Sequence, residues 1–291
     1  MRVKRILLLV ATAILLTGCV ATTPQAEPVD YSELAHDALA ARPGVQAAEL
    51  TQEPIEGESD PDLAEPADWV VTLSVTMDDT ATADQVAQVA DAALAFCEQY
   101  AVPDQWTAAI GFELIDTEPD DDLPAPDRSG FPVYPEGVDA RDFMAVRGAP
   151  GVRSVLFGSG FPLVTVAEAS NLPAVQQLLV GMPLWQEGGT LWAENGRVRL
   201  TELPESLTPA GYAMIIAAST AYPAAQFWLE APTTGHGWPQ LFVDQVALDE
   251  APGVGLALSG PANAAPYDVN YFIRAIGPDG PVDSAGVLGT S

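Results

Sequence analysis

Hydrophobic and polar residues alternate with two periodicities, one typical of strands and one of helices, along most of the chain. The stretch WVVTLSVTM over 69–77 alternates apolar residues with small or polar ones, as a half-buried strand does. Residues 83–100 instead repeat apolar side chains every three to four positions behind the capping pair Thr82 and Gln85, which predicts a helix. A helix over 31–41, a strand from Val45 and a strand over 106–116 complete an αββαβ order.

Three further segments each have the pattern strand, helix, strand, and they span 131–158, 162–194 and 197–231. Their helices are predicted over 138–148, 171–180 and 209–221. The last helix has Thr208 as its cap and Pro209 at its first position, and both favour a helix start. The tripeptide Pro-Gly-Val precedes predicted strands at 43–45, 150–152 and 252–254, where its glycine can adopt the positive φ of a turn. More strands are expected near 240–247, 254–259 and 268–276, with no pairing assigned.

Two βαβ units joined by a hairpin form the ferredoxin-like βαββαβ arrangement, in which an antiparallel sheet carries its helices on one face. Residues 162–231 fit that arrangement best. We therefore predict an α+β protein of repeated βαβ units with ferredoxin-like sheets. Residues 117–130 are rich in proline and acidic residues, which predicts a linker between an N-terminal domain over 30–116 and a C-terminal domain over 131–291.

A tight turn fixes the register of one predicted hairpin. In TLWAENGRVRLT, the Asn-Gly pair at 195–196 favours a two-residue type I′ turn. This turn places Glu194 opposite Arg197 and Trp192 opposite Arg199. Alternation along both strands then turns these side chains away from the helices.

The strand AQFWLE over 225–230 turns Trp228 outward in the same way. Two tryptophans and two arginines thus share one sheet face, with a cation-π pair expected between Trp192 and Arg199. Tryptophan beside arginine is typical of surfaces that hold sugar rings or protein partners. The predicted ligand-binding residues are Trp192, Arg197, Arg199 and Trp228. The alternative is that other parts of the chain cover this face, which would make the tryptophans interdomain core.

The first residues have the order of an export signal. Arg2, Lys4 and Arg5 precede an apolar run over 6–17, and Cys19 follows. As a helix this run would span about 18 Å, short of the roughly 30 Å hydrocarbon core of a membrane. The sequence Leu-Thr-Gly-Cys at 16–19 resembles the lipobox of bacterial lipoproteins. That resemblance implies removal of residues 1–18 and a diacylglyceryl group on Cys19, with residues 19–29 as a short tether.

Processing would leave a strongly acidic protein. The three basic residues of the signal are lost, so eight arginines remain against 40 acidic residues, a net charge of −32. Such a charge repels nucleic acid, which excludes DNA and RNA as expected partners. With Cys19 modified, Cys97 is the remaining thiol, and its place on an apolar helix stripe predicts a buried structural role.

Motifs for catalysis, cofactors or metals are not found in the sequence. No nucleophile elbow, phosphate-binding loop, dinucleotide fingerprint or EF-hand occurs, and Gly158-Ser159-Gly160 fits a hairpin turn. The two histidines, His36 and His236, lack the spacing of zinc ligands. The run Asp120-Asp121-Asp122 fits a solvated charge cluster. We expect neither cofactor nor metal.

Together these features predict a lipid-anchored, extracytoplasmic envelope protein that binds a partner or scaffolds the cell surface, rather than an enzyme. One alternative is a cell-wall glycan or solute-binding protein that uses the Trp192, Arg199 and Trp228 face. The other is a hydrolase that uses His236 in its glycine-rich loop. The sequence does not predict the oligomeric state.

Overall fold

The computed structural model describes residues 31–54, 69–100, 106–113, 128–135, 137–158, 162–193, 197–202, 207–231, 239–261, 264–265, 268–278 and 280–289. Statements about structure below concern these residues. The predicted signal with Cys19, most of the predicted linker and the loop with His236 lie outside them.

The chain is a succession of six units, each consisting of a helix and two strands. The first three units are α1 (Ser32–Leu39), β1 (Val45–Pro54), β2 (Trp69–Met77); α2 (Ala83–Tyr100), β3 (Trp106–Glu113), β4 (Arg128–Val133); and α3 (Ala140–Arg147), β5 (Val152–Leu156), β6 (Leu163–Val166). The last three are α4 (Leu172–Val180), β7 (Gly189–Ala193), β8 (Val198–Glu202); α5 (Pro209–Ala221), β9 (Gln226–Glu230), β10 (Gln240–Ala247); and α6 (Ala251–Leu258), β11 (Asn270–Gly277), β12 (Gly280–Val287). Short 3-10 turns flank α4 at Ala169–Asn171 and Pro183–Trp185.

Several helix starts follow from the predicted capping residues. Thr208 accepts the backbone N–H of Gly211 at 3.2 Å, and Pro209 is the first residue of α5. Thr82 and Gln85 bond to each other's backbone N–H groups at the start of α2. Each of these bonds satisfies an N–H that the first helical turn leaves without a partner.

All twelve strands form one mixed sheet, in which their spatial order equals their order along the chain. Strands joined by a hairpin pair antiparallel, and strands joined by a helix pair parallel. The ferredoxin-like arrangement predicted for 162–231 is not confirmed. It requires interleaved, antiparallel strands, whereas here β6 and β7 are parallel neighbours, and so are β8 and β9.

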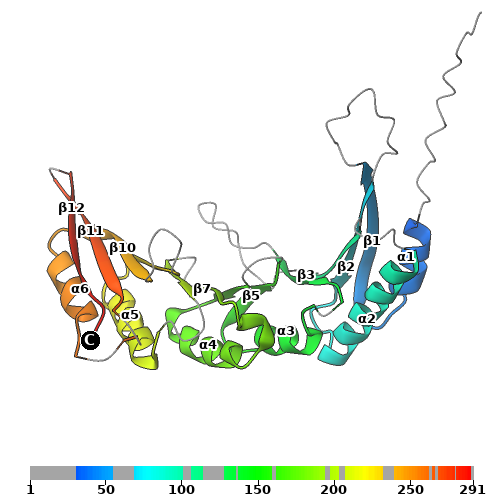
Figure 1. Ribbon diagram of the computed structural model, residues 1–291, viewed down its shortest axis with the longest axis horizontal. Helices are drawn as coiled ribbons and strands as arrows, with labels where there is room; N and C mark the ends of the chain where they lie inside the picture. The colour runs from blue at the N-terminus through cyan, green and yellow to red at the C-terminus, as the bar shows by residue number, and fades with distance from the viewer. Residues whose placement is uncertain are drawn as a thin grey trace, which may run out of the picture.

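The six helices form one layer on one face of this sheet, and each contacts the next (Figure 1). Each of the helices α2 to α6 forms a crossover, which connects one strand to the next, parallel strand. The strands that precede successive crossovers alternate in direction, but every crossover leads to the neighbour on the same side, toward β12. With all helices on one face, the crossovers must therefore alternate in hand. At least two of the five in the described chain are left-handed, although about 98% of such connections in proteins are right-handed.

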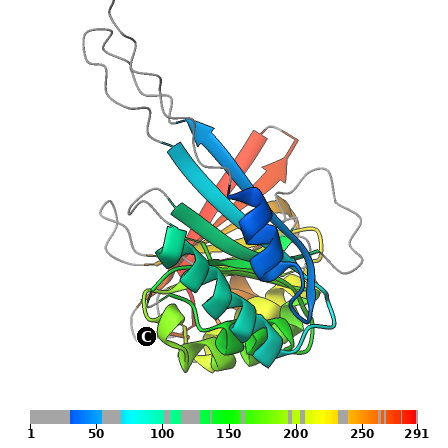
Figure 2. The same cartoon turned by 90° about the vertical axis from the view of Figure 1, so that its right-hand side faces the viewer.

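The sheet is long and curved. In Figure 1 both ends rise on the side opposite the helices, so the helix-free face is concave and the helices lie on the convex side. Figure 2, which looks along the array, shows β1 and β2 slanting against β11 and β12. That difference in direction is the accumulated twist of a multistranded sheet.

A continuous hydrophobic core lies between the sheet and the helices, from Ala35 in α1 to Leu288 after β12. The sheet also continues across the predicted linker, because β3 pairs with β4 from Ala108 opposite Val133 to Glu113 opposite Arg128. That the segments 30–116 and 131–291 fold independently stays a prediction.

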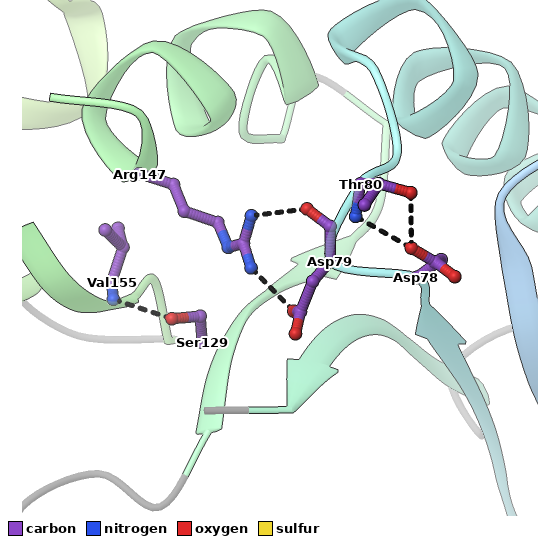
Figure 3. A network of polar contacts seen from close by, with 6 residues as sticks. All are labelled: Asp78, Asp79, Thr80, Ser129, Arg147 and Val155. Carbon is purple, nitrogen blue, oxygen red and sulfur yellow. Dashed lines mark hydrogen bonds and ion pairs between the residues drawn. The ribbon is translucent and has the colours of Figure 1, made fainter. Parts of the chain in front are cut away.

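An arginine ties the first two units to the third. Arg147 at the end of α3 pairs with Asp79, with Nη2 and Oδ1 2.8 Å apart (Figure 3). Its guanidinium also lies 4.2 Å from the centre of the Phe112 ring. In the same turn the Asp78 carboxylate accepts the N–H and hydroxyl of Thr80, which lowers the pKa of Asp78. The Ser129 hydroxyl accepts the N–H of Val155 and so links β4 to β5.

The predictions for the last part of the chain are only partly right. A strand was expected near 254–259, but α6 occupies that position and buries Val254 and Leu258. Pro252 and Gly253 therefore lie in the first turn of a helix. At the other two Pro-Gly-Val sites the expected turn is confirmed, because Gly44 has φ +84° and Gly151 has φ +80°. The strand β12 was not predicted.

Candidate functional site

Five side chains cross the C-terminal half of the helix-free face, one from each strand of β7 to β11. Trp192 lies opposite Arg199, Arg199 beside Trp228, Trp228 opposite Phe242 and Phe242 beside Phe272. We call these five residues the aromatic row. Their neighbours along each strand, such as Leu191, Leu200 and Phe227, are buried beneath the helices. The predicted register of the Trp192 hairpin is confirmed.

Most members of the aromatic row contact the next member. The Arg199 guanidinium lies 5.6 Å from the centre of the Trp192 ring, so the predicted cation-π pair is present. The ring centres of Trp228 and Phe242 are 5.9 Å apart, and those of Phe242 and Phe272 are 5.5 Å apart and stacked. Aromatic rings at these separations attract each other and hold their planes in place. The row is therefore an ordered surface.

None of the described elements covers the face that carries the aromatic row. Arg199 is exposed, Phe272 is 38% exposed, and the other three members are half-buried. In the described chain the C-terminal strands extend the sheet sideways instead of covering it. The alternative in which these tryptophans form interdomain core therefore finds no covering layer among the described residues.

Three polar atoms on this face have unmet hydrogen-bonding capacity. The indole N–H groups of Trp192 and Trp228 and the hydroxyl of Thr165 are shielded from water and have no partner in the described part of the chain. Thr165 lies beside Trp192 in β6, at the end of the aromatic row. A shielded polar group without a partner costs free energy, and because these atoms are closed to solvent they are also closed to a ligand in this arrangement.

Polar residues flank the aromatic row on both sides. On one side lie Thr190, Thr201, Glu230, Gln240 and Asn270, and on the other lie Arg197, Gln226, Asp244, Arg274 and Asp283. The two threonine hydroxyls are 3.1 Å apart, and Arg274 pairs with Asp283 at 3.3 Å. Across the row and its flanks three arginines balance three carboxylates, so this face is close to neutral on a chain of net charge −29.

A bulge in β10 borders the row. The pairing of β10 with β11 shifts between Val243 and Val246, and Gln245 there has φ +57°. A non-glycine residue in this region is strained, and bulges re-aim side chains next to functional sites.

Arg197 differs in position from the other predicted binding residues. Its guanidinium donates a hydrogen bond to the carbonyl oxygen of Pro223 in the loop before β9. Arg197 therefore links the start of β8 to that loop. Glu194 lies outside the described residues. Sequence reasoning missed Phe242 and Phe272, although the alternation in QLFVDQVA and NYFIRAIG places both on the polar side of their strands. The sequence pattern did not show that the strands of Phe242 and Phe272 follow the strand of Trp228 in the sheet.

The N-terminal half of the helix-free face is chemically different. Small and polar residues cover it, among them Thr72, Thr76, Thr107, Gly111 and Gly130. The hydroxyls of Thr72 and Thr107 are 3.1 Å apart. The aromatic row is thus confined to one part of the concave face.

The remaining candidates for chemistry that the structure describes do not assemble a site. His36 is exposed on α1, and His236 lies outside the described residues. Burial raises the pKa of the half-buried Cys97 thiol to about 11, and Glu98 adds to that shift, so the reactive thiolate is scarce at neutral pH. Within the described ranges no group of three or more His, Cys, Asp or Glu side chains is placed to bind a metal ion. No described helix has the length and hydrophobicity needed to cross a membrane.

Comparison with known proteins finds no matching family model, no similar curated protein and no similar solved structure.

Proposed function

We propose that this protein is a lipid-anchored, non-catalytic protein on the extracytoplasmic side of a membrane, and that its aromatic row binds a neutral glycan chain. The observation that supports the proposal is the row itself: Trp192, Arg199, Trp228, Phe242 and Phe272 in register across five strands of an open, concave face. Concave sheet surfaces of repeat proteins commonly bind extended ligands.

The dimensions of the row suit a chain molecule. Five adjacent strands at about 4.8 Å spacing give a row roughly 19 Å long and one side chain wide. A protein interface of standard size buries about 800 Å² on each partner, which is broader than such a row. A single extended polymer that crosses the strands fits it better.

The chemistry of the row suits sugars. Aromatic rings offer flat apolar surfaces to the C–H faces of pyranose rings, while hydroxyls at the ring edges can meet the flanking polar residues. The half-buried flanking side chains Thr201, Gln226 and Asp244 supply donors and acceptors beside the stacking surface. The balance of three arginines and three carboxylates favours a neutral ligand over a strongly charged one.

The anchoring part of the proposal rests on the lipobox-like segment that ends in Cys19. Because two or more acyl chains anchor a protein stably, Cys19→Ala should move the protein from the membrane fraction to the soluble fraction. Retention of a processed Cys19→Ala protein in the membrane would exclude lipidation as the anchor.

Glycan binding is tested with the full-length protein in detergent, by titrating its tryptophan fluorescence with neutral cell-wall oligosaccharides of increasing length. Affinity should rise with chain length until the row is filled. Trp228→Ala should weaken binding about 5- to 160-fold, because one stacked aromatic contact contributes roughly 1–3 kcal/mol. Tyr134→Ala is the matched control, since Tyr134 is a 50% exposed aromatic residue that follows β4, away from the row.

Equal losses in Trp228→Ala and Tyr134→Ala would remove the row from the binding site. If no oligosaccharide binds but an envelope protein does, and Trp228→Ala abolishes that interaction, the row is a protein-binding surface instead.

A further inference from the structure

Both ends of the sheet are open. In the described chain β1 pairs only with β2, and β12 pairs only with β11. Each of these edge strands is eight or more residues long. An unpaired edge of this length presents a row of backbone N–H and C=O groups that another strand can bind.

The two edges match in direction. Hairpin pairs are antiparallel and helix-linked pairs are parallel, so strand direction repeats every four strands. In each group of four strands, the first and fourth run in one direction and the second and third in the other. Twelve strands form three such groups, so β12 runs in the same direction as β1. The next strand in this pattern would be parallel to β12 and preceded by a helix. The described part of a second copy begins with those two elements, α1 and β1.

At the β12 end of the sheet, no described helix lies beyond α6. Val282 of β12 lies opposite Ala275, whose side chain is buried on the helix-facing side of β11. Val282 itself is 50% exposed, and no described helix follows α6 on this side of the sheet. On β1 the helix-facing Ala48 and Leu50 are only half-buried. Terminal repeats of stable arrays normally have a polar outer surface, which these positions lack.

We infer that the protein associates head to tail, with β1 of one copy pairing in parallel with β12 of another and α1 covering Val282. This contact would repeat the geometry of the five internal junctions, in which a helix and its following strand add to the preceding strand. It is a heterologous contact, so it builds a ring or an open filament rather than a closed dimer. The inference does not depend on what the aromatic row binds.

Charge gives the association a distinctive salt dependence. Each copy carries a net charge of −29 in its full sequence, so copies repel one another at low ionic strength. Salt screens this repulsion, with a Debye length of about 10 Å at 0.1 M that shrinks to about 3 Å at 1 M. Association should therefore strengthen as salt is added, whereas an association held by ion pairs would weaken.

Disulfide cross-linking of the full-length protein tests the arrangement. One variant carries Ala285→Cys on the helix-free side of β12, and the other carries Ala47→Cys, Glu49→Cys or Thr51→Cys on the same side of β1. Neighbouring strands about 4.8 Å apart lie within the Cα separation of roughly 4.4–6.8 Å that a disulfide needs. Mixing under mild oxidation should give a band of twice the monomer mass for at least one of the three β1 positions.

Matched controls separate this arrangement from other contacts. Ala48→Cys faces the helices, so it should not cross-link to Ala285→Cys. The unmixed variants should remain monomeric on the gel. Cross-linking of Ala285→Cys with itself would overturn the inference, because it would mean that two β12 edges pair with each other. Failure to cross-link at all three β1 positions would also overturn the inference, if the unmodified protein sediments as a monomer at low and high salt.

Discussion

The contact between Arg147, Asp79 and Phe112 makes a sharp prediction about how the array is held together. Arg147→Met keeps most of the side-chain volume but removes the charge. The Arg147 side chain is only 13% exposed and Asp79 is 39% exposed, so their ion pair is partly shielded from water and salt. The substitution also removes the cation-π contact with the buried Phe112 ring.

The expected loss can be worked from these contacts. A charge-assisted hydrogen bond in a partly buried site contributes roughly 1–2 kcal/mol, and a cation-π contact adds about 1 kcal/mol when partly desolvated. Arg147→Met should therefore lower the free energy of unfolding by about 2–3 kcal/mol. At roughly 2–4 °C per kcal/mol for a chain of this size, the melting temperature should fall by about 4–12 °C.

Urea and thermal unfolding, followed by circular dichroism, measure this loss. The control is Arg141→Met, because Arg141 pairs with Asp84 at 3.1 Å but both side chains are largely exposed, at 62% and 75%. Exposed pairs of this kind contribute less than about 1 kcal/mol. A double-mutant cycle with Asp79→Asn isolates the ion pair. Equal effects of Arg147→Met and Arg141→Met would refute the claim that burial makes the first contact the stronger one.

Three other predictions follow from the surroundings of single residues. A Cβ at Gly189 would overlap the ring of the buried Trp185, so Gly189→Ala should lower the free energy of unfolding by about 2 kcal/mol or more, while Gly158→Ala meets no atom within 4 Å and should be close to neutral in the same urea titration. Gln245→Gly should raise the free energy of unfolding by up to about 1 kcal/mol, since glycine tolerates the φ of +57°; a loss of stability would show that the bulge is not strained. The Cys97 pKa of about 11 predicts slow alkylation at pH 8 that accelerates up to pH 11, with Cys97→Ser as the blank. The free energy of unfolding should also fall between pH 9 and 11, because the folded thiol holds its proton more tightly than the unfolded one. Alkylation at pH 8 as fast as in urea would contradict it.

Local signals in the sequence predicted local structure well. The Asn-Gly pair in the sequence predicted the observed register of the Trp192 hairpin, and Thr208 with Pro209 predicted the start of α5 at the correct residue. The same kind of signal failed at 252–254, where Pro-Gly-Val opens a helix instead of a strand. A short apolar run fits either structure, and here burial of Val254 and Leu258 against the sheet and α5 decided the outcome.

The order of the strands could not be predicted from pattern alone. A ferredoxin-like sheet keeps both of its crossovers right-handed, because its second crossover steps back across the sheet. This chain steps onward each time and accepts left-handed crossovers, which the general preference for right-handed connections argues against. Without that order Phe242 and Phe272 could not be placed beside Trp228, so only the first part of the aromatic row was predicted.

Because each strand pairs only with its neighbours in sequence, the chain can build its sheet progressively. Loops between paired strands are short compared with the whole chain, so little entropy is lost before each new pairing is gained. An N-terminal portion could thus fold while the rest is still being synthesised or translocated, and folding would advance strand by strand along the array. Truncations made after successive hairpins should therefore lose stability in steps rather than fail together.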